Sequence, residues 1–111
     1  MAKFWVASLL CLSWTTAALA DEAPDIWAAK CKVCHGEDGR ARTKVGAKEK
    51  IPDFTSPKWQ SRHSDNFIKK TILNGSEDNP KMKPFKNKLT EQEIDSLVLH
   101  IRSFFKPTPP S

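Results

Sequence analysis

Three residues within five positions carry the most specific chemical signal in the chain. Cys31 and Cys34 are separated by two residues, and His35 follows directly. Side chains three positions apart lie on one face of a helix, so both thiols can reach the two vinyl groups at one edge of a porphyrin. The adjacent imidazole can bind iron on the same face. The C-x-x-C-H spacing therefore predicts one covalently attached haem c, with His35 as an axial iron ligand.

Two other uses of paired cysteines fit the sequence less well. A structural zinc site needs four nitrogen or sulfur ligands, but apart from the motif the chain after residue 20 offers only His63 and His100. A thioredoxin-like redox pair would follow a strand in a βαβ unit, and the sequence predicts no such setting. Haem attachment is therefore the favoured interpretation of the motif.

The first twenty residues have the features of a secretory signal peptide. Lys3 gives a basic start, residues 4–12 are almost all apolar, and residues 18–20 match the A-x-A cleavage pattern. The apolar run is shorter than the roughly 20 residues that span a membrane. We therefore expect cleavage after Ala20, export to the periplasm and no membrane anchor.

The remaining sequence, residues 21–111, is short enough for one domain only, with a proline-rich tail from Pro107. A domain of this size is marginally stable on its protein core alone, so a buried haem would supply missing apolar volume. The whole chain has a net charge of +5. Its basic run from Arg40 to Lys50 contains no aromatic residue, unlike a nucleic-acid surface, so we expect a solvated loop and no nucleic-acid partner.

The first part of the domain is predicted to contain one helix and a long turn-rich segment. Residues 21–34 form the helix, with Pro24 in its first turn, an apolar stripe that includes Trp27, and an end near Gly36. Residues 36–61 are predicted to be loop, apart from a short helical turn that opens at residues 56–59.

The second part is predicted to contain two helices joined by a loop over residues 76–88. One helix starts at Ser64 or Asp65 and ends at Asn74-Gly75. The last helix follows a capping box that begins at Thr90. Its apolar residues recur at steps of three and four, namely Ile94, Leu97, Val98, Ile101 and Phe105.

A haem iron bound by one histidine needs a second axial ligand. Met82 is the only methionine after residue 20, and it lies in the 76–88 loop with Pro84 close behind. A thioether opposite an imidazole is the ligand pair of electron-transfer cytochromes. We therefore predict Met82 as the second iron ligand, with His63 and His100 as the alternatives.

Together these features resemble a small monohaem class I c-type cytochrome. The resemblance covers residues 31–36, the Pro52-Asp53-Phe54 turn, Gly75, Met82 with Pro84 and Phe85, and the final amphipathic helix. It implies an all-α fold of three to four helices wrapped around one covalent haem, with the first and last helices crossed.

The resemblance also implies further residues of the haem pocket. The carbonyl of Pro52 is expected to accept a hydrogen bond from the Nδ1–H of His35, which would fix the imidazole tautomer. Either Phe104 or Phe105 is expected to face the first helix. Because the chain lacks tyrosine, Trp59 is the expected partner of a haem propionate.

The predicted function is one-electron transfer between periplasmic redox partners, by a monomer that is not an enzyme. Exposed lysines would steer the haem edge onto acidic docking surfaces: Lys30, Lys32, Lys81, Lys83, Lys86 and Lys88. Two alternatives remain. One is a haem protein whose open sixth site binds a small ligand or peroxide, and the other is the electron-transfer subunit of a larger oxidoreductase.

Overall fold

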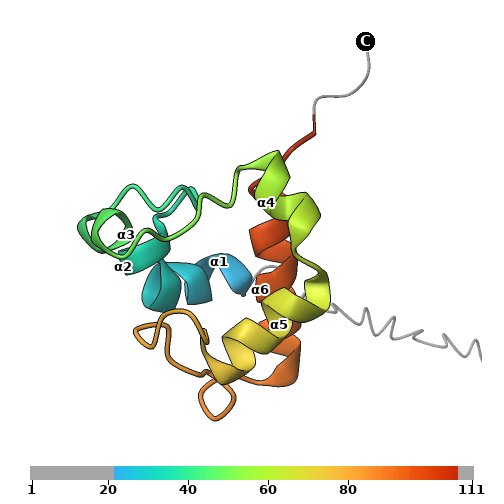
Figure 1. The fold of residues 1–111 in the computed structure, drawn as a ribbon. Helices are drawn as coiled ribbons and strands as arrows, with labels where there is room; N and C mark the ends of the chain where they lie inside the picture. Colours follow the sequence, from blue (N-terminus) through green and yellow to red (C-terminus); the bar gives the residue numbers. More distant parts are fainter. Residues whose placement is uncertain (1–21, 108–111) are drawn as a thin grey trace, which may run out of the picture.

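The computed structural model describes residues 22–107. The predicted signal peptide and the end of the tail lie outside this range. The described chain is helical and contains no strand, which confirms the predicted all-α fold (Figure 1). None of its helices is long and apolar enough to cross a membrane. The helical segments in order are α1 (Ala23–Ile26), η2 (Trp27–Cys31), α2 (Lys32–His35), α3 (Lys44–Lys48), α4 (Pro57–Arg62), α5 (Asp65–Asn74) and α6 (Glu91–Ser103).

The first three segments follow one another without a break, as the sequence predicts, but the middle one is a π-helix. The backbone N–H of Lys32 donates to the carbonyl of Trp27, five residues earlier. This wide turn holds one residue more than an α-turn. The side chains after Cys31 therefore point in different directions from those they would have in an unbroken α-helix of the same sequence. The predicted apolar stripe is therefore broken: Trp27 is buried, whereas Val33 is 70% exposed.

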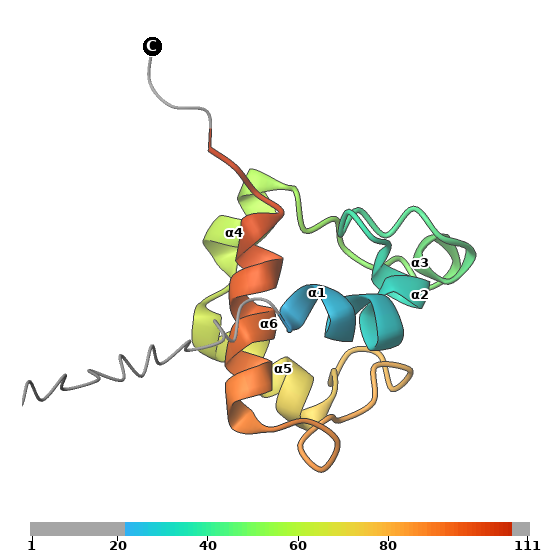
Figure 2. The same cartoon turned by 180° about the vertical axis from the view of Figure 1, so that it is seen from behind.

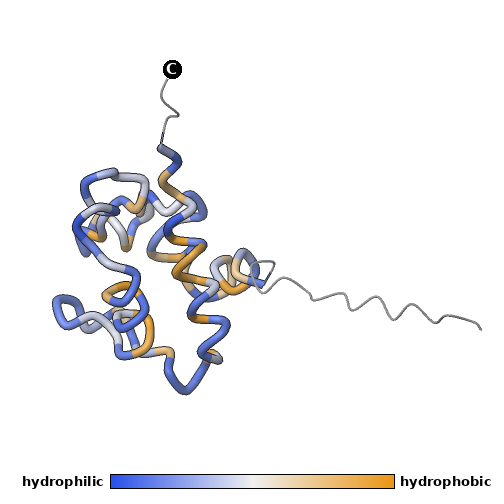
Figure 3. The backbone as a smooth tube through the Cα atoms, turned by 90° about the vertical axis from the view of Figure 1, so that its right-hand side faces the viewer, coloured by the Kyte–Doolittle hydropathy of each residue, from blue (hydrophilic) through white to orange (hydrophobic). Residues whose placement is uncertain are grey.

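The core lies where the first helical segment meets the last helix. Ala23 and Trp27 are buried, and α1 contacts α6. Ile94 and Leu97 of α6 are fully buried. Figure 2 shows the two helices crossing, as expected, and Figure 3 shows apolar residues concentrated on the helices while the loops are mostly polar.

The predicted helix starts are formed by the expected capping residues. The side chain of Ser64 accepts a hydrogen bond from the N–H of Phe67 and so begins α5. Thr90 and Glu93 form the reciprocal capping box at the start of α6. These contacts pair N–H groups that would otherwise lack a partner in the first turn.

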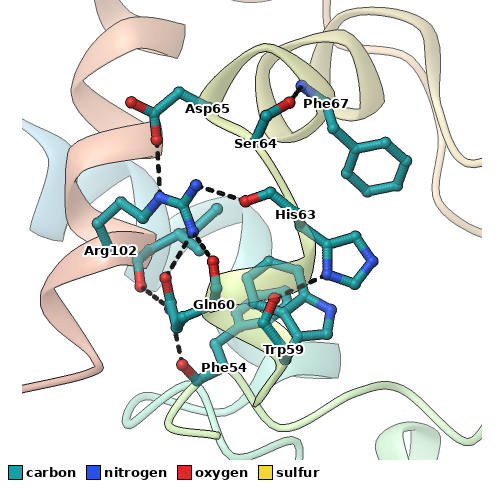
Figure 4. Close-up of polar contacts among 9 residues, drawn as sticks. Phe54, Trp59, Gln60, His63, Ser64, Asp65, Phe67 and Arg102 are labelled. Atoms are coloured by element: carbon teal, nitrogen blue, oxygen red, sulfur yellow. Dashed lines mark hydrogen bonds and ion pairs between the residues drawn. The ribbon is translucent and has the colours of Figure 1, made fainter. Parts of the chain in front are cut away.

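The arginine at the end of α6 fixes this helix to α4 and α5 (Figure 4). The Nε of Arg102 donates to Asp65 at 2.7 Å, and its Nη1 donates to both the carbonyl and the side-chain oxygen of Gln60 at 2.8 Å. Its Nη2 donates to the carbonyl of His63. The amide of Gln60 in turn donates to the carbonyl of Phe54 at 2.8 Å. Phe54 is thereby tied to the rigid helical part of the domain.

The segment predicted as a solvated loop contains a helix, α3, that the sequence interpretation missed. Thr43 begins it by accepting a hydrogen bond from the N–H of Gly46 at 2.9 Å. The hydroxyl of Thr43 also donates to the carbonyl of Cys34 at 2.7 Å. This side chain thus connects α3 to the end of the first helical segment.

Candidate haem-binding site

Both cysteines of the motif are free thiols at the end of the first helical segment. Cys31 and Cys34 are partly buried, and they form no disulfide. Burial raises the pKa of Cys31 to about 11, so this group is a neutral thiol at neutral pH. Two free thiols one helical turn apart are the groups that thioether attachment requires.

The imidazole of His35 is partly buried and lies against two aromatic rings that also contact each other. Its centroid lies 4.9 Å from that of Phe54, in a stacked arrangement, and 5.6 Å from that of Trp27. Burial lowers the pKa of His35 to about 4, so the ring is neutral at neutral pH, the form that binds metals. Its Nδ1 atom is buried and has no hydrogen-bond partner among residues 22–107. A neutral, incompletely paired imidazole beside two thiols fits the donor set of haem c.

Pro52 does not make the predicted hydrogen bond to His35. Pro52 is exposed, and the Nδ1 of His35 lacks a partner. Two residues further on, the N–H of Phe54 donates to the carbonyl of Gly39 at 2.9 Å, and the Phe54 ring is buried. Of the predicted Pro52-Asp53-Phe54 turn, it is the Phe54 ring that stacks on the imidazole.

Trp59 lies in the same aromatic cluster, with Phe54 between it and His35. Its ring centroid is 4.4 Å from that of Phe54 and 4.7 Å from that of His63, on which it stacks (Figure 4). The carbonyl of Trp59 is paired with Nδ1 of His63 at 2.8 Å. Its indole N–H makes no hydrogen bond within the described part of the chain, so this donor is available to another group.

Met82 is half-buried and packs against the hydrophobic core. Its N–H donates to the carbonyl of Asn79 at 3.1 Å, and its own carbonyl accepts from the N–H of Ser76 at 3.2 Å. Gly75 has a φ of +82°, and a Cβ there would lie 2.7 Å from the Met82 carbonyl oxygen. Glycine is therefore required where α5 leads into this loop.

The two other histidines are engaged in aromatic contacts. His63 stacks on Trp59, as described above. His100 of α6 lies 5.3 Å from Trp27, and its buried Nε2 has no hydrogen-bond partner among residues 22–107.

The structure decides which of two neighbouring phenylalanines faces the first helix. The ring of Phe104 is 5.0 Å from that of Trp27. It packs directly on Gly39, where a Cβ would approach it to 2.6 Å. The absence of a side chain at Gly39 therefore makes room for Phe104.

The crossed helices, the paired thiols with an adjacent, partly buried imidazole, and the methionine loop together define a small c-type cytochrome. Residues 18–101 match the family described as cytochrome c oxidase, cbb3-type, subunit III, and the chain belongs to this family. Its cofactor is accordingly haem c, and its role is that of an electron carrier.

Solved structures agree with this assignment. The c-type cytochrome KustC0563 is 36% identical, with a TM-score of 0.68 over 76% of this chain and 98% of that one. Cytochrome CL from the marine methylotrophic bacterium Methylophaga aminisulfidivorans is 20% identical, with a TM-score of 0.60 over 82% of this chain and 56% of that one, and shares the fold. Comparison with curated proteins gave no match.

Proposed function

We propose that this chain is a periplasmic electron carrier in which Cys31 and Cys34 hold the haem and His35 and Met82 bind its iron. The observation that carries this proposal is the position of His35. A neutral, partly buried imidazole follows two free thiols on one helical segment. Trp59 supplies its unpaired indole N–H to a propionate.

The haem supplies the one-electron chemistry, and the protein supplies ligands, burial and a docking surface. With both axial positions occupied by protein groups, no substrate needs to bind iron, so the chain itself has no enzymatic activity. Trp27 and Phe54 keep the His35 ring in a fixed orientation and exclude water from it. Met82 is presented from a separate loop that packs on the core.

Exposed lysines provide the docking surface for acidic partner proteins. Of the six lysines predicted for this surface, Lys81 pairs with Glu49, and Lys88 lies 5.8 Å from the centre of the Phe85 ring. The other four form no ion pair within the described residues: Lys30, Lys32, Lys83 and Lys86. Lys30 and Lys32 flank the first thioether position, and the other two follow Met82 closely in sequence. The electric field of these lysines would increase the rate at which the protein meets a partner with an acidic surface. Added salt would screen this field and lower the rate.

The ligand set is tested by spectra of the exported protein in both oxidation states, beside a Met82→Ala variant. Mass spectrometry first establishes whether the chain carries a covalent macrocycle. We expect a low-spin wild type with the weak long-wavelength band of a ferric iron–thioether bond, and loss of that band in Met82→Ala. A wild type that is high-spin and binds carbon monoxide readily would instead indicate an open sixth site, and would contradict the proposed ligands.

A second candidate function follows from the family match, whose description names a subunit of an oxidase. In that case the carrier would deliver electrons within a larger oxidoreductase. Purification of the tagged chain from its native host under mild conditions distinguishes the two, because a subunit would copurify with stoichiometric partners and a free carrier would elute alone.

A further inference from the structure

The glutamate that follows α3 reaches across to the loop of Met82. Glu49 is the C-terminal capping residue of α3, and its side chain is 18% exposed. One carboxylate oxygen accepts a hydrogen bond from the side-chain amide of Asn79 at 3.2 Å. The other forms an ion pair with the Nζ of Lys81 at 2.5 Å. Glu49 and this loop are about thirty residues apart in sequence, so the contact joins two separate segments.

Asn79 transmits this contact to the residues beside it. While its Nδ2 donates to Glu49, its Oδ1 accepts from the N–H of Lys81 at 3.0 Å. Its carbonyl accepts from the N–H of Met82 at 3.1 Å, and its own N–H donates to the hydroxyl of Ser76. The carboxylate therefore orients a side chain whose other hydrogen bonds set the backbone at Met82.

The other end of α3 is fixed to the cysteine motif. The Thr43 hydroxyl that begins α3 donates to the carbonyl of Cys34, and α2 and α3 contact each other. A continuous set of contacts thus runs from Cys34 through α3 to Glu49 and on to the Met82 loop. The hydrogen bond from Lys81 lowers the pKa of Glu49, and the bond from Asn79 acts in the same direction, so the carboxylate is ionised at neutral pH.

We propose that Glu49 is a positioning residue that holds the Met82 loop at a fixed distance from the haem-attachment helix, so that the thioether stays in reach of the iron. The proposal rests on the ligand set proposed above. Ligands that must meet a metal from separate segments depend on such outer contacts for their orientation. Glu49 itself touches neither iron nor porphyrin in this scheme.

Displacement of Met82 by added imidazole measures how firmly the loop is held. Imidazole binds ferric iron only when the thioether has left, so its apparent affinity rises with the fraction of open loop. We expect Glu49→Ala to bind imidazole roughly three- to tenfold more tightly than wild type, the range for loss of a partly exposed charged contact. Glu49→Gln, which keeps an acceptor for Asn79 but loses the charge, should lie between the two.

Two further measurements separate positioning from general stability. Glu91→Gln is the matched control, because Glu91 also forms an ion pair with a lysine, Lys69, at 2.9 Å but lies at the start of α6. It should leave imidazole affinity unchanged. Hydrogen exchange at the amides of Lys81 and Met82 should be faster in both Glu49 variants and unchanged in Glu91→Gln. Glu49→Gln alone decides the question if Glu49→Ala does not fold.

The Met82→Ala variant keeps this test distinct from that of the proposed function. If wild type and Met82→Ala bind imidazole equally, Met82 is not a ligand, and both proposals are overturned. If Met82→Ala binds more tightly than wild type while both Glu49 variants match wild type in affinity and exchange, the ligand set stands. In that case only the positioning role of Glu49 is overturned.

Discussion

The indole N–H of Trp27 donates a 2.8 Å hydrogen bond to the carbonyl of Gly36, nine residues further along the chain. Trp27 is 3% exposed, so this bond is made in the core. It joins the beginning of the π-helical turn to the residue that directly follows the cysteine motif. The same ring also lies against His35 and Phe104.

Replacement of Trp27 by phenylalanine should destabilise the protein by about 1–3 kcal/mol, because the buried carbonyl of Gly36 would lose its donor. The aromatic contact with His35 would be largely kept. Chemical denaturation of the haem-loaded protein, followed by circular dichroism, measures the change in the free energy of unfolding. An unchanged free energy would show that water replaces the indole at Gly36.

Arg102→Lys should cost about 1–3 kcal/mol, because an ammonium group cannot satisfy the acceptors that the planar guanidinium pairs at once. These acceptors belong to Asp65, Gln60 and His63. Lys69→Ala is the control, since its ion pairs with Glu91 and Asp95 join exposed carboxylates. Thermal and denaturant unfolding should show the larger loss in Arg102→Lys, and equal losses would contradict the role assigned to the arginine.

The stability of the protein should fall as the pH is lowered from about 6.5. Burial lowers the pKa of His100. At a pH just below 6.5, this histidine is therefore protonated more often in the unfolded chain than in the folded chain. Stability from this group is therefore complete above the unfolded pKa and is lost below it. His100→Leu should reduce the slope of the unfolding free energy against pH between pH 7 and pH 5. A slope equal to that of wild type would assign the effect to other groups.

Electron-transfer rates with an acidic redox protein should decrease as ionic strength rises. Lys32→Gln and Lys83→Gln should each lower the rate at low salt and weaken the salt dependence. Lys106→Gln is the control of equal charge change, because it lies beyond the end of α6 that is far from the Met82 loop (Figure 1). Stopped-flow kinetics at several salt concentrations measure these rates. A wild-type rate that does not change with salt concentration would rule out steering by these lysines.

Features that depend on neighbouring residues were predictable from the sequence. Thr90 and Glu93 cap α6 because both signals lie within one turn. Ser64 begins α5 for the same reason. The cysteine motif is equally local, since its chemistry depends only on spacing along one helix. The apolar period of α6 gave four positions that are buried, namely Ile94, Leu97, Val98 and Ile101. The fifth, Phe105, lies beyond the end of the helix and is only partly buried.

Features that depend on distant contacts were not predictable. The bond from Asn79 to Glu49 spans thirty positions and leaves no sequence pattern. The choice of Phe104 over Phe105 depends on the space above Gly39. The helix α3 was missed because a central glycine, Gly46, weakens helix propensity, although Thr43 was a usable capping signal. The hydrogen bond predicted from His35 to Pro52, seventeen positions away, is not formed among residues 22–107, where the Nδ1 of His35 has no partner.

The π-helical turn accommodates one extra residue without changing the direction of the residues that follow it. Deleting Ala28 or Ala29, both exposed alanines, would leave Lys32 four residues from Trp27, so the same two groups could form an ordinary α-helical hydrogen bond. The later side chains would then keep their orientation toward the pigment. Forcing residues 27–31 into an α-turn at unchanged length would instead rotate His35 about the helix axis and away from it.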